Sequence, residues 1–126
     1  MEVKNIKKDS LEERIEKAIE ETREELEDLT EPTCYIYSSV LAENLSKEHL
    51  FYEIVSTEDY DYSYKHQFTI IPKNDEELYL IDLMYDHFQS DKFYELLQKG
   101  YMLIRGEQCR EYLDIVGNDP NNIKKY

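Results

Sequence analysis

The stretch YKHQFTIIPKNDEELYLIDLM, residues 64–84, constrains the fold more than any other part of the chain, because it reads as two apolar strands around a polar turn. Side chains on a strand alternate between its two faces, so every second residue shares a face. On the first strand one face holds His66 among apolar neighbours, and on the second strand one face holds Asp82. Two half-buried strands that each carry one ionisable side chain predict an antiparallel sheet with a polar contact inside it.

The two ionisable residues become partners if Lys73, Asn74 and Asp75 form a three-residue hairpin loop. In that register His66 lies directly opposite Asp82, with Cβ atoms about 4.5–5.5 Å apart. A register shifted by two residues would still leave them close. An unpaired buried carboxylate is costly, whereas one bonded to an imidazole is tolerated and fixes the tautomer of the ring. The simplest alternative is a His–Asp pair that only satisfies a polar spot in the core.

Hydrophobic periodicity and capping residues place further helices and strands on either side of this hairpin. The predicted elements are, in order, a helix over 9–30, a helix over 33–47, a strand over 49–56, an acidic connection over 57–63, the hairpin, a helix over 90–100 and a helix over 106–117. Residues 101–104 fit either a brief strand or a loop. The order predicts an α+β fold, in which flanking helices pack on an antiparallel sheet of about three to four strands. We expect one domain over 1–126, with its core at 33–116 and a loose tail at 118–126.

The acidic N-terminal helix predicted over 9–30 is apolar along one side and charged along the other. Its apolar stripe has helical spacing and consists of Leu11, Ile15, Ala18, Ile19, Thr22, Leu26 and Leu29. On the charged side, glutamates such as Glu16 and Glu20 repel each other at i,i+4 spacing, so the helix needs its stripe packed on the rest of the protein. The acids form a solvated face in the simplest interpretation and a partner-binding surface in the alternative.

Charge and composition exclude several classes of function. The formal net charge of −14 argues against binding to nucleic acid phosphates and permits a basic protein partner. No apolar run is long enough to cross a bilayer, and MEVKNIKKDS lacks the apolar region of a signal peptide, so we expect a cytoplasmic protein, with delivery into another cell by a secretion system left open. Cys34 and Cys109 are then expected as free thiols. Three scattered histidines and no paired-cysteine motif predict no metal site and no cofactor.

Cys34 is the candidate nucleophile of the chain. Thr33 is a suitable N-cap for the second predicted helix, which places Cys34 in the first helical turn. A helix N-terminus and a neighbouring imidazolium both favour the thiolate, which is the reactive form of cysteine. If this helix packs across the sheet, Cys34 can act as nucleophile, His66 as general base and acid, and Asp82 as orienting group, while backbone N–H groups of the first turn bind the oxyanion. In the alternative interpretation Cys34 is a small packing side chain, the role we expect for Cys109.

The order of these residues resembles the papain-like and transglutaminase-like superfamily, in which a helix-opening cysteine precedes a strand histidine and then an aspartate. The text YLIDLMYDHF, residues 79–88, followed by FYELLQKGYMLIRGEQCREYL, residues 93–113, is also similar to that of bacterial papain-fold toxins and effectors. These proteins often carry YLIDxTxxQF, a short helix, a glycine and a helix with a Tyr-Leu pair. The resemblance covers residues 33–115.

The resemblance implies a papain-like or transglutaminase-like core in which Cys34, His66 and Asp82 are the catalytic residues of a cysteine hydrolase. Thr33 and Gln67 are the candidates for a side chain that helps to bind the oxyanion. We expect hydrolysis or deamidation of a protein side chain, because a small chain leaves little room for an extended substrate cleft. Peptidase, transglutaminase and acyltransferase activities stay open. A second class of function also stays open, an acidic binding or inhibitor protein that occupies a basic surface of its partner.

Overall fold

The computed structural model describes residues 10–31, 33–84 and 93–118 of the 126-residue chain. In chain order its elements are α1 (Ser10–Leu26), α2 (Cys34–Lys47), β1 (Glu53–Ser56), the 3₁₀ turn η1 (Thr57–Asp59), β2 (Gln67–Pro72), β3 (Glu77–Ile81), α3 (Glu95–Lys99), β4 (Tyr101–Arg105) and α4 (Gly106–Val116). In the described part of the chain the strands form one four-stranded antiparallel sheet in the order β1-β2-β3-β4. The predicted α+β class with an antiparallel sheet is therefore confirmed, and 101–104 belong to a strand.

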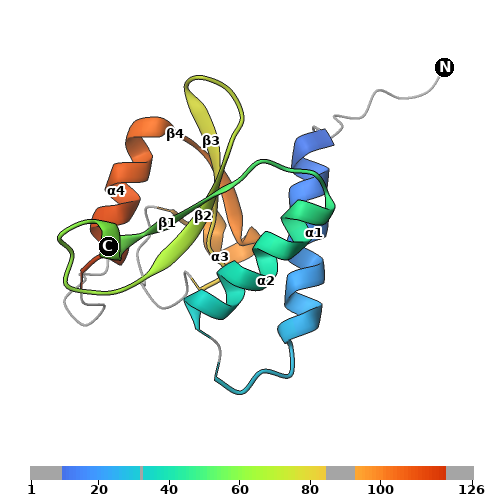
Figure 1. Cartoon of the computed structure of the whole chain (residues 1–126). Helices are drawn as coiled ribbons and strands as arrows, with labels where there is room; N and C mark the ends of the chain where they lie inside the picture. The colour runs from blue at the N-terminus through green and yellow to red at the C-terminus, as the bar shows by residue number, and fades with distance from the viewer. Residues whose placement is uncertain (1–9, 32, 85–92, 119–126) are drawn as a thin grey trace.

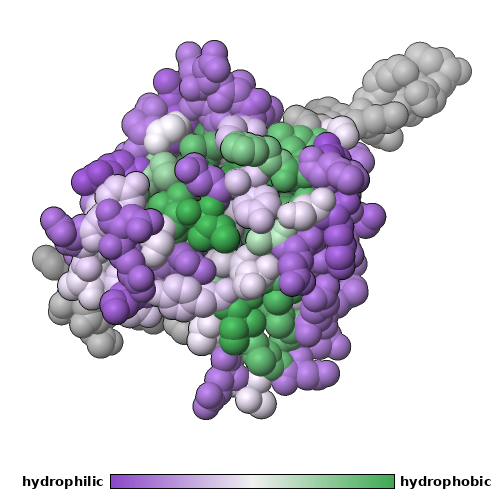
Figure 2. Space-filling model, in the orientation of Figure 1, coloured by the Kyte–Doolittle hydropathy of each residue, from purple (hydrophilic) through white to green (hydrophobic). Residues whose placement is uncertain are grey.

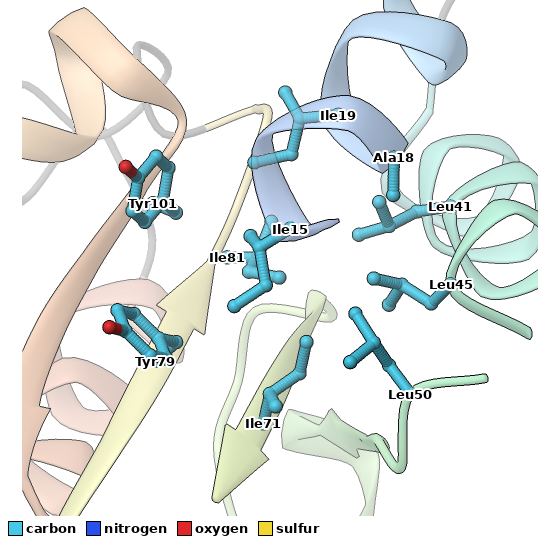
Figure 3. Close-up of a cluster of buried hydrophobic side chains, with 10 residues drawn as sticks. All are labelled: Ile15, Ala18, Ile19, Leu41, Leu45, Leu50, Ile71, Tyr79, Ile81 and Tyr101. Carbon is cyan, nitrogen blue, oxygen red and sulfur yellow. The ribbon is translucent and has the colours of Figure 1, made fainter. Parts of the chain in front are cut away.

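Helices cover both faces of the sheet, α1 and α2 on one side and α4 on the other (Figure 1). The side chains of α1 and α2 pack with Ile71, Tyr79 and Ile81 of the central strands in one apolar cluster (Figure 3). Phe68 and Leu80 point the other way, into a second cluster with α3 and α4. The prediction of half-buried strands is wrong for β2, because a helical layer lies on each face and residues 68–71 are all buried.

α1 follows the predicted apolar stripe but is shorter than expected. Ile15, Ala18, Ile19 and Thr22 are buried, as the helical spacing predicts. The helix ends at Leu26 rather than at residue 30, and Leu29 is 37% exposed. Beyond Leu26 the chain has no core to pack against, so the polar residues there gain nothing from helical structure. Residue 9 of the predicted helix lies outside the described residues.

α2 begins and ends at residues whose local chemistry explains its bounds. Thr33 caps it through a hydrogen bond from the Ile36 amide to Thr33 Oγ1 (3.2 Å), which confirms the predicted start at Cys34. At the other end His49 has a φ of 58° and the Leu50 amide donates to the Leu45 carbonyl (3.1 Å). Because residues 48–50 close the helix in this left-handed turn, the strand expected over 49–56 starts only at Glu53.

The hairpin between β2 and β3 has a register two residues away from the predicted one. Ile70 pairs with Leu80 instead of Leu78. The turn is centred one residue later, at Asp75 instead of Asn74, because Asn74 Oδ1 accepts hydrogen bonds from the Glu76 and Glu77 amides (2.9 and 2.8 Å), which draws Glu76 into the loop. A two-residue shift keeps every side chain on its face, so the face assignments remain as predicted.

The C-terminal half of the chain keeps its predicted order with shorter elements. α3 covers Glu95–Lys99 rather than 90–100, and the expected capping residue Ser90 lies outside the described residues, as do 119–126 of the predicted loose tail. α4 covers Gly106–Val116, close to the predicted 106–117. Within the described residues no helix is both long and apolar enough to cross a membrane.

The face of the molecule that carries β1 and α2 is mixed in polarity. Figure 2 shows apolar patches over these two elements and hydrophilic side chains along α1. Phe51, just before β1, is 77% exposed and Ile54 within it is 39% exposed. β1 is an edge strand of the sheet, so this apolar surface borders a sheet edge.

Gly100 ends α3 in the left-handed conformation and lies against the end of β3. Its φ is 82°, and its carbonyl accepts a hydrogen bond from the Asp82 amide (3.0 Å). A Cβ atom at this position would lie 2.6 Å from Leu83 Cδ2 and 2.8 Å from a guanidinium nitrogen of Arg23. Glycine is therefore required here for its conformation and for its size.

The substitution Gly100→Ala is expected to lower the free energy of unfolding by about 1–2 kcal/mol from backbone strain alone. The close contacts of the added Cβ atom with Leu83 and Arg23 are expected to lower it further. The measurement is urea unfolding followed by circular dichroism. Gly106→Ala is the matched control, because a Cβ atom there meets nothing closer than 3.9 Å and is expected to cost nothing. Equal losses for the two variants would contradict the assignment.

Candidate active site

The three candidate catalytic residues converge at one end of the sheet. His66 immediately precedes β2, Asp82 immediately follows β3, and Cys34 is the first residue of α2. The His66 Nε2 and Asp82 Oδ2 atoms are 2.6 Å apart, and both side chains are almost fully buried. The predicted register placed the two residues directly opposite each other, and in the structure they are not directly opposed. Their side chains meet beyond the paired part of the strands, which is the outcome expected for a register shifted by two residues.

Asp82 is a buried carboxylate that accepts hydrogen bonds from three different parts of the fold. Besides His66, the Tyr112 hydroxyl on α4 donates to Asp82 Oδ2, and the Met84 amide donates to Oδ1 (3.0 Å). Only 4% of Asp82 is exposed. These three hydrogen bonds compensate the carboxylate for the loss of its hydration.

His66 is fixed through its backbone as well as through its ring. The hydroxyl of Thr57 in η1 accepts a hydrogen bond from the His66 amide (2.8 Å) and donates to the Tyr64 carbonyl (2.8 Å). The Thr57 amide donates to the His66 carbonyl (2.9 Å). Thr57 is fully buried, so this link holds the residue before β2 in a rigid setting.

Cys34 lies half-buried at the N-terminus of α2, near enough to His66 for its thiol to contribute to the raised pKa of the ring. Because Asp82 takes Nε2, Nδ1 is the ring nitrogen left for the thiol. The helix supplies donors at the same place. The Ile36 amide is used by the cap, whereas helical geometry leaves the amides of Cys34 and Tyr35 without an intrahelical acceptor. These two N–H groups are the donors available for an oxyanion.

The charge state of His66 follows from opposing effects. Burial lowers the pKa of the ring, but the hydrogen bond that the ring donates to the Asp82 carboxylate, the neighbouring Cys34 side chain and the charge of both groups outweigh the effect of burial, so the pKa is raised to about 9. The imidazolium is therefore favoured at neutral pH, between a carboxylate on one side and a thiol on the other. A cation in this position stabilises a thiolate.

A cavity of about 10 Å³ lies between α2 and the sheet beside Cys34. It is lined by Tyr37, Ser38 and Leu41 of α2 and by residues of β2 and β3. This volume holds about one water molecule. Of the two side chains considered for the oxyanion, Gln67 lines this cavity, whereas Thr33 is used as the helix cap.

Two residues of the cluster were not predicted as site residues. Tyr112 is the tyrosine of the Tyr-Leu pair in the motif that resembles papain-fold toxins. That motif does not predict a hydrogen bond from the tyrosine hydroxyl to Asp82. Thr57 lies in the predicted acidic connection, and no sequence signal marks it. Cys109 packs at the margin of the cluster formed with α4, and burial raises the pKa of its thiol, with the charge of Glu53 adding to this. Within the described residues, no three His, Cys, Asp or Glu side chains are grouped to hold a metal ion.

No family model, curated protein or solved structure matches the chain. The resemblance to papain-like and transglutaminase-like proteins therefore rests on the sequence motifs.

The His66–Asp82 pair is expected to make stability depend on pH. The folded pKa of about 9 is above the ordinary 6.5, so the contribution is complete below pH 6.5 and is lost as pH rises through 9. We expect His66→Gln to cost about 3–5 kcal/mol at pH 6, because it leaves Asp82 buried without its cationic partner, and less at pH 10. Urea unfolding of both proteins across this range measures the difference. A difference that is constant with pH would contradict a raised pKa.

Proposed function

We propose that the protein is a cysteine-dependent acyl-transfer enzyme that hydrolyses an amide of a protein or peptide, of the deamidase or peptidase type. The observation that carries the proposal is the chain of contacts from Cys34 through His66 to Asp82, with the cysteine at a helix N-terminus. A thiol, an imidazole and a carboxylate in this order are the groups that nucleophilic amide hydrolysis needs. In this assignment Cys34 is the nucleophile, His66 the general base and acid, and Asp82 the orienting group.

In the first half of the reaction the Cys34 sulfur, as the thiolate paired with the His66 imidazolium, attacks the carbonyl carbon of the amide. The carbonyl oxygen becomes an oxyanion, which accepts hydrogen bonds from the Cys34 and Tyr35 amides. The carbon–nitrogen bond then breaks, and the nitrogen leaves with the proton held by His66, as ammonia or as a peptide amine. The product is a thioester on Cys34.

In the second half a water molecule attacks the thioester while His66 accepts one of its protons. The carbon–sulfur bond breaks, the acid is released, and the proton stays on His66 beside the Cys34 thiolate, which restores the starting ion pair. Asp82 keeps its charge throughout and stabilises the imidazolium in both halves. An amine in place of water would complete a transglutaminase or acyltransferase reaction on the same groups.

The surroundings of Cys34 favour a side chain presented by another protein. The described residues there enclose only the water-sized cavity, whereas the first turn of α2 carries Tyr35 and Ile36 at the surface, 42% and 36% exposed. A glutamine or asparagine amide can reach a half-buried thiol at such a surface without an extended cleft. On the sequence motifs we also propose membership of the papain-like and transglutaminase-like group, as a bacterial effector or toxin.

Alkylation of the two cysteines tests the proposed nucleophile. At pH 6 we expect iodoacetamide to modify Cys34 at least tenfold faster than Cys109, since an imidazolium favours the thiolate at the first position and burial disfavours it at the second. Mass spectrometry of the tryptic peptides gives both rates within one sample.

His66→Ala is expected to remove the advantage of Cys34 at pH 6, and Cys34→Ala is expected to abolish ammonia or peptide release from any protein substrate found. Cys109→Ser is the matched control and should leave turnover unchanged. A Cys34 that reacts with the pH dependence of an ordinary thiol would rule out the proposed nucleophile.

A second candidate function, binding of a basic protein, is favoured by a groove along α1. The groove has a volume of about 530 Å³. Its lining includes three glutamates of α1 and Glu27 just after it, against two cations, Arg23 and Lys99. Together with the net charge of −14, this surface suits the binding of a partner rich in lysine and arginine. The protein would then act as an inhibitor of that basic protein.

Binding of an oligolysine peptide is the measurement for this second function. We expect the affinity to fall at least tenfold between 50 and 500 mM NaCl, because salt screens exposed charges. The double variant Glu20→Gln/Glu24→Gln should weaken binding, the control Glu76→Gln/Glu111→Gln should not, and Cys34→Ala should leave it intact. An affinity that does not depend on salt would remove the charge-based explanation.

A further inference from the structure

Tyr112 occupies an unusual place beside the candidate site. It projects from α4, on the opposite face of the sheet from Cys34 and α2, and it is fully buried. Its hydroxyl donates to Asp82 Oδ2, the same oxygen that bonds to His66 Nε2. One carboxylate oxygen therefore serves two donors from two different layers of the fold.

The ring of Tyr112 is held so that its hydroxyl has little freedom. Phe68 of β2 and Phe93 each pack edge to face against it, with ring centroids 4.9 and 5.1 Å away. Edge-to-face contacts of this kind stabilise a pair by about 0.5–1.5 kcal/mol beyond the burial of area. The two phenylalanine rings fix the direction of the Tyr112 hydroxyl, which donates its hydrogen bond to Asp82.

We propose that Tyr112 is a positioning residue that keeps the Asp82 carboxylate aimed at His66 for the reaction. This inference rests on the proposed function of Cys34, His66 and Asp82 and adds a fourth member that does not touch the substrate. A hydroxyl is a suitable choice for this position because it donates to the carboxylate without bringing a second charge into the core.

A hydrogen bond to the ionised form of a carboxylate stabilises that form and withdraws charge from the bonded oxygen. Asp82 Oδ2 bonds directly to the His66 ring, and the Tyr112 hydroxyl donates to that same oxygen, so Tyr112 influences the ring through Asp82. Tyr112 therefore weakens the pull of Asp82 on the imidazole proton. It holds the pKa of His66 nearer to neutrality than the carboxylate alone would, which suits a group that must both take and give a proton.

The decisive experiment is an NMR titration of the His66 ring in Tyr112→Phe, which keeps the ring packing and removes only the hydroxyl. We expect the pKa of His66 to rise by half a unit or more. Tyr101→Phe is the control, because it removes a buried tyrosine hydroxyl bonded to Glu12 and Glu16 of α1, away from the site. In that variant the pKa of His66 should not change.

An unchanged or lowered pKa of His66 in Tyr112→Phe would overturn the proposal. If that variant does not fold, 3-fluorotyrosine in place of Tyr112 keeps the ring and donates more strongly, so it should lower the pKa of His66, and no change there would overturn the proposal equally. These outcomes are separate from the proposed function. Absence of turnover in every variant would count against catalysis by Cys34, while the titration alone decides the role of Tyr112.

Discussion

A single buried carboxylate organises the candidate site and the junction of elements around it. Asp82 accepts hydrogen bonds from His66 before β2, from Tyr112 on α4 and from the Met84 amide, and its own amide donates to Gly100 at the end of α3. An ion of this kind is tolerated in a core only while its donors stay in place. The geometry of the sheet end, of α4 and of the turn before β4 is therefore coupled to the ionisation of one side chain.

The two helical layers supply different parts of the site. α2 lies on one face of the sheet and provides Cys34 with its helix N-terminus, whereas α4 lies on the other face and provides Tyr112. His66 and Asp82 stand between them at the end of the central strands. Each helical layer has its own apolar cluster, so Cys34 and Tyr112 are held by different clusters. The His66–Asp82 pair connects the two residues.

The sequence predicts the local features of this arrangement well. Thr33 caps α2 and puts Cys34 at its first position, and strand alternation puts His66 and Asp82 on one face of the hairpin. The predicted register is wrong, because the Asn74 side chain closes a turn that is centred one residue later, yet a shift of two residues keeps every side chain on its face. The roles of Tyr112 and Thr57 depend on contacts between distant segments, which periodicity and capping rules do not describe. The number of strands depends on β4, whose short apolar run fits a loop equally well.

The edge of the sheet at β1 has a consequence for the behaviour of the protein at high concentration. The four residues of β1, with Ile54 at the surface and Phe51 just before the strand, form an exposed apolar sheet edge. A strand of a second copy could pair with such an edge. Mutual repulsion between molecules that each carry a charge of −14 opposes this at low ionic strength. Added salt shortens the range of that repulsion but leaves the apolar edge intact, so colloidal stability and crystallisation depend on the buffer more than on the fold.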